Sequence, residues 1–229
     1  MPHYVETIVY FQGSNENIQR MLDDLDPQKT GKFTLDKVIA MPAELLDVDS
    51  SMVGYVVDGL LSSTDDDLTI ESDDNNLHAG EKTKLYKLGI TPQTTIGEAK
   101  KQIREIPELA EYIALFDKYG ACDWYEWAIR NVGTKSFNAE FCISQVEECV
   151  CITGDTAWSV PEPIIKELVK RYDLPVHGCA IEQCQLYVSD IDTIDGEVYF
   201  IYYENEADMQ TVLENHGMGD YFYDDELAD

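Results

Sequence analysis

FNAEFCIS at residues 137–144 and VEECVCIT at residues 146–153 decide the fold class, because polar and apolar side chains alternate along both runs. Alternation of this kind gives an extended strand one apolar face, and two adjacent runs predict an antiparallel hairpin. Upstream, YVETIVYFQ at 4–12 predicts a further strand. Downstream, we predict strands at about 177–188 and 196–203, joined by a turn.

Two helices alternate with these strands. Ser14 is the expected N-cap of the first helix, which carries Ile18, Met21, Leu22 and Leu25 on one face. Ser159 with Glu162, and the early Pro161, predict the start of the second helix. The order strand, helix, strand, strand, helix, strand is that of a split β-α-β repeat. We therefore predict an α+β protein with a ferredoxin-like antiparallel sheet, helices on one face and an inserted helical region.

The insertion contains its own helix signals. Residues 41–46 predict a short helix, and Thr95 with Glu98 forms a capping-box pattern. Pro107 suits a first helical turn, and Gly120 and Gly133 suit helix ends. Asp123 with Glu126 predicts the cap of another helix.

Two domain divisions are compatible with this order. In the first, residues 1–229 form a single domain, with a ferredoxin-like core at 4–25 and 137–203, an α-rich insertion at 36–136 and an acidic tail at 204–229. In the second, an α-rich domain at 1–135 precedes a ferredoxin-like domain at 136–229.

The formal net charge of −29 at pH 7 constrains the partners of this chain. It exceeds the magnitude of about 2 to 8 that keeps a small domain soluble, and like charges cost stability through self-repulsion. We expect no direct contact with nucleic acid, whose phosphates require basic residues. No apolar stretch approaches the roughly 20 residues that cross a bilayer. The start of the chain has no secretion signal, so we expect a cytoplasmic protein with reduced cysteines and no membrane contact.

The acidity is segregated along the chain. No Lys or Arg occurs between Lys37 and Lys82, or after Arg171. The first gap contains the stretch SSTDDDLTIESDDNN at 62–76, which predicts an exposed acidic loop, and the second ends in an aromatic and acidic tail. We predict that acids and aromatics of both segments bind a partner: Asp65, Asp66, Asp67, Glu71, Asp73, Asp74, Tyr221, Phe222, Tyr223, Asp224, Asp225 and Glu226.

Catalytic and metal-binding motifs are not evident. The sequence has no nucleophile elbow, phosphate-binding loop or His-Glu-x-x-His helix, so we expect no enzyme and no cofactor. Residues 26–37 resemble an EF-hand loop, but Lys37 stands where calcium needs a bidentate Glu, and an ordinary turn at Thr30-Gly31 is expected. The six cysteines form no Cys-x-x-Cys zinc knuckle, although Cys149 and Cys151 share a strand face.

Four segments carry a resemblance to a known family. They are Phe33–Leu45, Trp124–Trp127, Asn131–Lys135 and Asp155–Pro161. In this order they resemble the YubB-like family of phage and plasmid proteins, although Val132 and Ser136 replace the tryptophans that the family usually has. The resemblance covers most of 1–45 and 120–203. It implies a ferredoxin-like C-terminal part, an origin in a mobile element, and action in a bacterial host cytoplasm. It also places Trp124, Trp127 and Trp158 in the core.

Charge and resemblance together suggest a function. We expect a non-enzymatic phage or plasmid protein that mimics nucleic acid and inhibits a basic host protein, such as a restriction or CRISPR nuclease in an anti-defence role. The competing interpretation is that the acidic segments only keep the chain solvated. A divalent-metal-dependent enzyme or ion binder, which would use Asp190, Asp192 and Asp195, is the alternative function.

Overall fold

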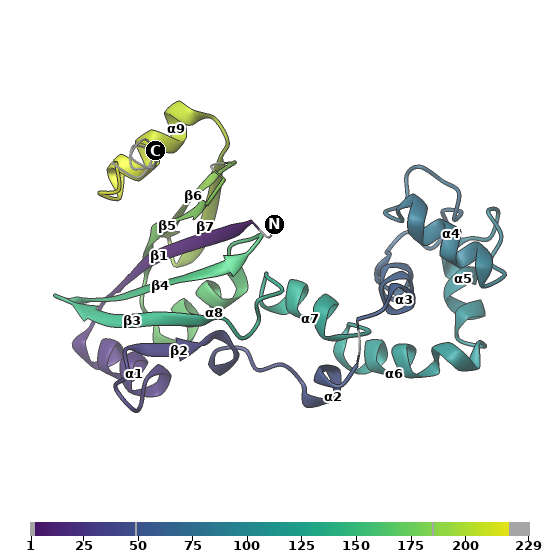
Figure 1. Ribbon diagram of the computed structural model, residues 1–229, viewed down its shortest axis with the longest axis horizontal. Helices are drawn as coiled ribbons and strands as arrows, with labels where there is room; N and C mark the ends of the chain where they lie inside the picture. Colours follow the sequence, from purple (N-terminus) through teal and green to yellow (C-terminus); the bar gives the residue numbers. More distant parts are fainter. Residues whose placement is uncertain (1–2, 49, 185, 220–229) are drawn as a thin grey trace, which may run out of the picture. The chain divides into compact units, whose positions relative to one another are not determined.

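The protein is described by a computed structural model that covers residues 3–48, 50–184 and 186–219 (Figure 1). The chain divides into two compact units. Residues 1–40 and 131–229 form the first, here called the sheet unit, and residues 41–130 form the second, here called the helical unit.

The centre of the sheet unit is strand β1 (Tyr4–Gln12), which pairs antiparallel with β4 (Cys149–Ala157) on one side and β5 (Val176–Glu182) on the other. Strand β3 (Glu140–Val146) pairs with β4 as the predicted hairpin. The order β3-β4-β1-β5, with a helix after β1 and another after β4, is that of a ferredoxin-like sheet. The predicted fold class, including a helical region inserted between strands, is confirmed.

Three further strands extend this core to a seven-stranded sheet among the described residues. They are β2 (Lys32–Thr34) beside β3, and β6 (Val188–Ile194) and β7 (Glu197–Tyr203) beyond β5. The single strand predicted at 177–188 was wrong, because β5 ends at Glu182 and β6 begins at Val188. The Glu182 side chain causes this break, since its Oε2 accepts backbone N–H bonds from Cys184 and Leu186 and closes a turn.

Helices α1 (Asn15–Leu25) and α8 (Glu162–Tyr172) lie on the same side of the sheet (Figure 1). Every second residue of β1, including Val5, Val9 and Phe11, is buried beneath them. The C-terminal α9 (Glu206–Asn215) packs against Cys179 and Ile181 of β5. Cys179 pairs with Ile8 of β1, and Ile181 pairs with Glu6. These residues of β1 lie on the face away from Val5, Val9 and Phe11, so α9 covers part of the opposite face of the sheet.

Two predictions near the start of α8 were wrong. Trp158 was placed in the core, but its residue is 49% exposed and has a φ of +73°. The Lys135 Nζ lies 3.7 Å from the centre of its indole ring, and this contact holds the side chain at the surface. Ser159 does not cap α8, because its hydroxyl donates to the Gly133 carbonyl; the helix begins behind Pro161 without a side-chain cap.

The helical unit holds α2 (Ala43–Leu46), α3 (Met52–Ser62), α4 (Ala79–Lys87), α5 (Ile96–Ile103) and α6 (Ala110–Tyr119), and α7 (Trp124–Asn131) ends at its boundary. Short 3₁₀ turns occur at Leu35–Lys37 in the sheet unit and at Pro107–Leu109 here. The unit has its own apolar core, which includes Val57, Leu60, Ile70, Leu85, Ile96, Ile103 and Leu109. The capping box at Thr95 and Glu98 is confirmed, as is the left-handed Gly120 at the end of α6. Helices α3 and α4 were not predicted.

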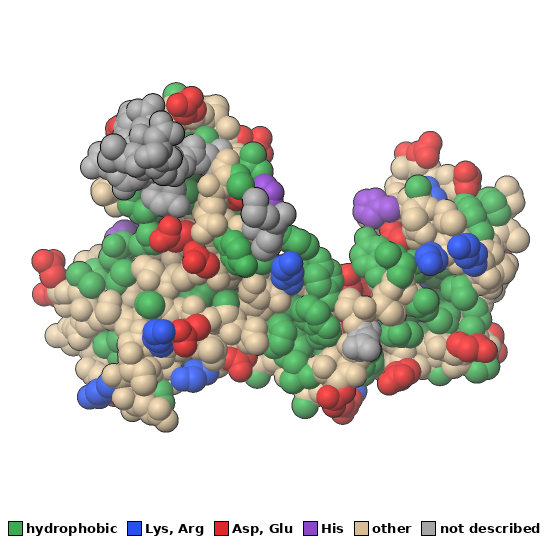
Figure 2. All heavy atoms as spheres, in the orientation of Figure 1, with side chains coloured by type: hydrophobic (Ala, Val, Ile, Leu, Met, Phe, Trp, Pro, Cys, Tyr) green, Lys and Arg blue, Asp and Glu red, His purple; other side chains and the backbone are tan. Residues whose placement is uncertain are grey.

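Surface charge differs between parts of the sheet unit. On the face drawn in Figure 2, Lys and Arg side chains (blue) lie over the region of α1 and β2 and also near α4 and α5, while Asp and Glu side chains (red) are spread over both units. Among the helices of the described residues, we find none with the length and apolarity needed to cross a membrane.

Candidate functional site: a buried ion pair in an acidic cavity

A polar cluster of the helical unit is built on α3. Ser51 caps this helix by accepting a bond from the Gly54 N–H, so the chain turns into the helix at a fixed point. Two glycines then let other elements approach closely. A Cβ at Gly59 would lie 2.2 Å from Glu81 Oε1, and a Cβ at Gly54 would lie 3.0 Å from the Tyr112 ring.

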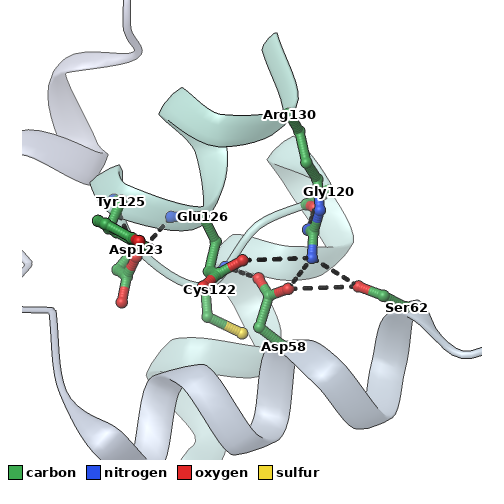
Figure 3. Close-up of polar contacts among 8 residues, drawn as sticks. All are labelled: Asp58, Ser62, Gly120, Cys122, Asp123, Tyr125, Glu126 and Arg130. Atoms are coloured by element: carbon green, nitrogen blue, oxygen red, sulfur yellow. Dashed lines mark hydrogen bonds and ion pairs between the residues drawn. The ribbon is translucent and has the colours of Figure 1, made fainter. Parts of the chain in front are cut away.

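Asp58 lies on this helix and is fully buried. Its Oδ2 accepts the Cys122 N–H at 2.8 Å, while Oδ1 accepts bonds from Arg130 and from the Ser62 hydroxyl (Figure 3). Arg130 projects from α7 toward α3 and also donates to the Gly120 carbonyl and the Ser62 oxygen. The pair therefore fastens the turn between α6 and α7 to α3.

Glu126 lies one helical turn before Arg130 on α7, with its Oε2 3.8 Å from the guanidinium. Burial, and then the neighbouring Asp58 carboxylate, raise the pKa of Glu126 to about 7, while Arg130 opposes this rise. Asp123 caps α7 by accepting the Tyr125 and Glu126 N–H groups, which confirms the predicted cap. Its own pKa is also raised, chiefly by burial.

Asp58, Glu126 and Arg130 line a cavity of about 230 Å³ that opens between α3, α4 and α7. Besides Asp58, Glu126 and Arg130, its lining includes Tyr55, His78, Asn76 and Glu81. Glu81 is 4% exposed, and its Oε2 accepts the His78 N–H as part of the cap of α4. Burial and the carboxylates of Glu81 and Glu126 raise the pKa of Tyr55, so its phenol stays protonated at neutral pH.

The chemistry of the cavity follows from this inventory. Three carboxylates face one guanidinium, so the cavity favours a cationic group. Glu126 can gain or lose a proton near neutral pH. The Cys122 thiol is fully buried, and burial followed by the charge of Asp58 raises its pKa, so it is not a reactive thiolate.

The predicted partner-binding residues of the loop at 62–76 lie at the surface, as expected for a binding loop. All six are exposed: Asp65, Asp66, Asp67, Glu71, Asp73 and Asp74. The loop is nevertheless fixed to the helical unit. Ile70 is fully buried and its N–H donates to the Thr94 carbonyl, while Asn75 donates to the Thr69 and Ile70 carbonyls. Lys100 forms an ion pair with Asp66 at 2.7 Å, so part of the loop's negative charge is balanced locally.

The predicted residues of the tail, Tyr221, Phe222, Tyr223, Asp224, Asp225 and Glu226, lie outside the described residues. The described part of the same base-free segment extends from Asp173 to Gly219. Its carboxylates lie just after α8, at the end of β5, on β6 and β7, in the segments that follow these two strands, and on α9. Among the described residues, no Lys or Arg forms an ion pair with a carboxylate of this segment.

Asp190, Asp192 and Asp195, the residues of the alternative ion site, are not brought together. Asp190 and Asp192 share one face of β6, and Asp195 lies in the turn that follows. Asp190 Oδ1 lies 2.9 Å from His216 Nε2. Among the described residues, the group of three potential ligands whose donor atoms converge is a different one, formed by His3, Glu182 and Cys184.

Sequence reasoning missed the Asp58 cluster. Asp58 lies in a stretch without basic residues, and its partner Arg130 is 72 positions away. A signal was nevertheless present, since Asp58 follows Val56 and Val57 and precedes Leu60 in an otherwise apolar run. A lone carboxylate on the apolar face of a helix requires a buried partner.

Comparisons with known proteins show a remote structural likeness. No family model matches the chain, and no curated protein matches it. The chain is structurally similar to the crystal structure of protein api92 from Yersinia pseudotuberculosis, which carries the family model DUF1281. The TM-score is 0.43 at 9% sequence identity, over 90% of this chain and 98% of that one. At this distance no activity or site residue transfers to the present chain.

Proposed function

We propose that this chain is a non-enzymatic binding protein that presents carboxylates to a basic, nucleic-acid-binding partner. The observation that carries the proposal is a long segment of the sheet unit whose sequence contains acids but no Lys or Arg. From Asp173 to Gly219 the described chain has no Lys or Arg, and its exposed acids include Asp192, Asp195, Glu197, Glu204, Glu206 and Glu214.

A surface of this kind suits a positively charged groove. A nucleic-acid site gains much of its affinity by neutralising phosphates with Lys and Arg, and carboxylates without a local counter-charge can occupy the same field. An exposed aromatic side chain lies beside these acids, because Tyr199 of β7 is 45% exposed and pairs with Asp192 of β6. Tyrosine is enriched among the residues that dominate binding energy.

The helical unit supports the same partner chemistry independently. Its cavity sets Asp58, Glu81 and Glu126 against Arg130, an excess of negative charge in a space of about 230 Å³. An ammonium or guanidinium group of a basic partner would find a favourable potential there. The resemblance to phage and plasmid proteins suggests a host defence protein, such as a restriction or CRISPR nuclease, as the partner.

The experiment is a capture from bacterial lysate on the immobilised full chain, followed by elution with duplex DNA. We expect DNA, but not an equal concentration of a neutral polymer, to release nucleic-acid-binding proteins, since both ligands would occupy one groove. The released protein is identified and its affinity for the chain is measured with purified components. If DNA releases no such protein, or if the purified partner binds DNA and this chain at the same time, the proposal fails.

A further inference from the structure

One cluster at the edge of the sheet unit combines three different metal-binding groups. His3 precedes β1, Glu182 ends β5, and Cys184 lies in the turn after it. One ligand atom of each, a histidine nitrogen, a carboxylate oxygen and a thiol sulfur, lies within 4.8 Å of the other two. From this convergence we propose that His3, Glu182 and Cys184 bind a zinc ion.

Glu182 is the ligand whose side chain is held most firmly. The residue is 2% exposed, and its Oε2 accepts N–H bonds from Cys184 at 2.9 Å and Leu186 at 3.1 Å. This leaves Oε1 directed at His3, whose Nδ1 lies 2.8 Å away. Within the described chain no Lys or Arg forms an ion pair with Glu182. A buried carboxylate requires a compensating cation, and a metal ion beside Oε1 would provide one.

The surrounding contacts hold the other two ligands in place. The Trp158 N–H donates to the His3 carbonyl at 2.8 Å, and the Gln183 N–H donates to the Tyr4 carbonyl at 3.0 Å. These bonds fix the first residues of β1 against the turn that carries Cys184. The N–H bonds that Glu182 Oε2 accepts orient this ligand side chain in addition.

The donor set favours zinc over calcium or magnesium. Nitrogen and thiolate ligands suit zinc, whereas calcium and magnesium take oxygen ligands. On binding, the Cys184 thiol releases its proton to solvent, and its thiolate together with the Glu182 carboxylate balances the two positive charges of the ion. Three protein ligands leave one position for water, and the exposed side chains of His3 and Cys184 give the ion access from solvent.

This site could not be predicted from the sequence, because His3 and Glu182 are separated by 179 positions. A local spacing pattern such as the Cys-x-x-Cys knuckle does not describe it. Only the pairing of β1 with β5 brings the start of the chain beside the end of β5, where Val5 lies opposite Glu182.

Cobalt(II) is the probe, because a bound thiolate gives it an intense near-ultraviolet charge-transfer band. We expect one Co²⁺ per full-length chain with this band, and its loss when one equivalent of Zn²⁺ is added. Cys184→Ser should abolish the band, and His3→Gln should weaken Co²⁺ binding by about tenfold or more. Cys142→Ser, which changes another exposed cysteine, is the matched control and should leave the band unchanged.

Both test positions are exposed, so far-UV circular dichroism of the variants should match that of the unchanged protein. A second readout is the reaction of Cys184 with a thiol reagent, which Zn²⁺ should slow while the reaction of Cys142 proceeds unchanged. The inference is overturned if no charge-transfer band appears, if the band survives in Cys184→Ser, or if Cys142→Ser removes it.

Discussion

Burial of a charged group costs free energy unless its hydrogen-bonding atoms find partners. Asp58 meets this condition, because Cys122, Ser62 and Arg130 between them bond both of its oxygens. Arg130 is shared in turn between Asp58, Ser62 and the Gly120 carbonyl. Removal of the Asp58 charge leaves Arg130, whose side chain is 33% exposed, without its closest carboxylate, and leaves the buried Cys122 N–H with a weaker acceptor.

Asp58→Asn should therefore lower the free energy of unfolding by up to about 3–5 kcal/mol, the range for breaking a fully buried ion pair from one side. The measurement is chemical denaturation followed by circular dichroism. Asp117→Asn is the control, since Asp117 forms a bidentate pair with Arg104 at the surface. Its cost should stay below about 1 kcal/mol. Equal losses from both substitutions would show that Asp58 has no special structural role.

Glu126 makes stability depend on pH in an unusual direction. Its pKa is about 7 in the folded protein against an ordinary value of 4.5, so between these values the folded state binds more protons than the unfolded state. The contribution of this group is then full below about pH 4.5 and is lost as the pH rises toward 7. Asp58, Glu81, Asp123 and Arg130 are the charged groups that set this value.

Glu126→Gln should remove this dependence. Relative to the unchanged protein, the variant should gain up to about 3 kcal/mol of unfolding free energy between pH 4.5 and 8, because it has no charge to bury. Urea unfolding at several pH values gives the difference curve. Glu111→Gln, which alters an exposed glutamate of α6, should give a flat curve; a flat curve for Glu126→Gln as well would contradict the raised pKa.

At the residue scale, the sequence predicted local bonds well and distant ones poorly. The Ser14 and Asp123 caps could be predicted because donor and acceptor lie within three positions of each other. The surface position of Trp158 could not, because it depends on a left-handed backbone and on Lys135. Asp58 was missed for the same reason, since Arg130 becomes its neighbour only through folding.

At the scale of elements, close contact between β1 and β5 holds the sheet unit together. Gly178 of β5 lies against the backbone of β1, and a Cβ there would lie 2.2 Å from the Ile8 carbonyl oxygen and 2.7 Å from Val9 Cα. These are backbone atoms of a central strand, so they have little freedom to move aside.

Gly178→Ala should destabilise the protein by about 1–3 kcal/mol or more, the usual cost of forcing extra atoms into a packed core. Gly80→Ala is the control, because Gly80 lies in α4 and a Cβ there meets nothing within 4 Å. That substitution should be neutral or stabilise by up to about 1 kcal/mol. Thermal unfolding of both variants checks the pair, and an unchanged melting temperature for Gly178→Ala would contradict the described register.

The elements that sequence reasoning recovered are those with a clear period or a cap. β1, β3, β4 and α1 have such signals, and the ferredoxin-like order followed from them. Helix α3 was missed because its two glycines and apolar composition weaken the helical pattern, although both glycines serve close packing. The split between β5 and β6 was missed because it depends on the Glu182 side chain rather than on a turn sequence.

At the scale of the whole molecule, each compact unit contains its own apolar core. In the helical unit this core is made by residues from Val56 to Cys122. A fragment of residues 41–133 should therefore fold alone, with helical circular dichroism and a single cooperative urea transition. A broad transition, or low helicity, would show that this unit depends on the rest of the chain.

Charge is the second property of the whole molecule. The net charge is −29, so any variant that loses acids also has a weaker overall electrostatic field. A test of the binding surface must therefore compare variants that lose the same number of acids. Two variants with four substitutions each meet this need. The first neutralises unpaired acids of the sheet unit: Asp192→Asn, Asp195→Asn, Glu197→Gln and Glu204→Gln. The second neutralises acids already paired with Lys or Arg: Glu44→Gln, Asp117→Asn, Glu140→Gln and Glu167→Gln.

The salt dependence of partner binding by these two variants tests the central claim most directly. With the DNA-released partner, we expect the unpaired-acid variant to bind more weakly than the unchanged protein. The slope of log affinity against log salt should fall by about one for each partner-binding carboxylate that the substitutions neutralise. The paired-acid variant should keep the affinity and slope of the unchanged protein. If the two variants instead bind alike at every salt concentration, the acids of the sheet unit are only a solvated surface and the proposed function is wrong.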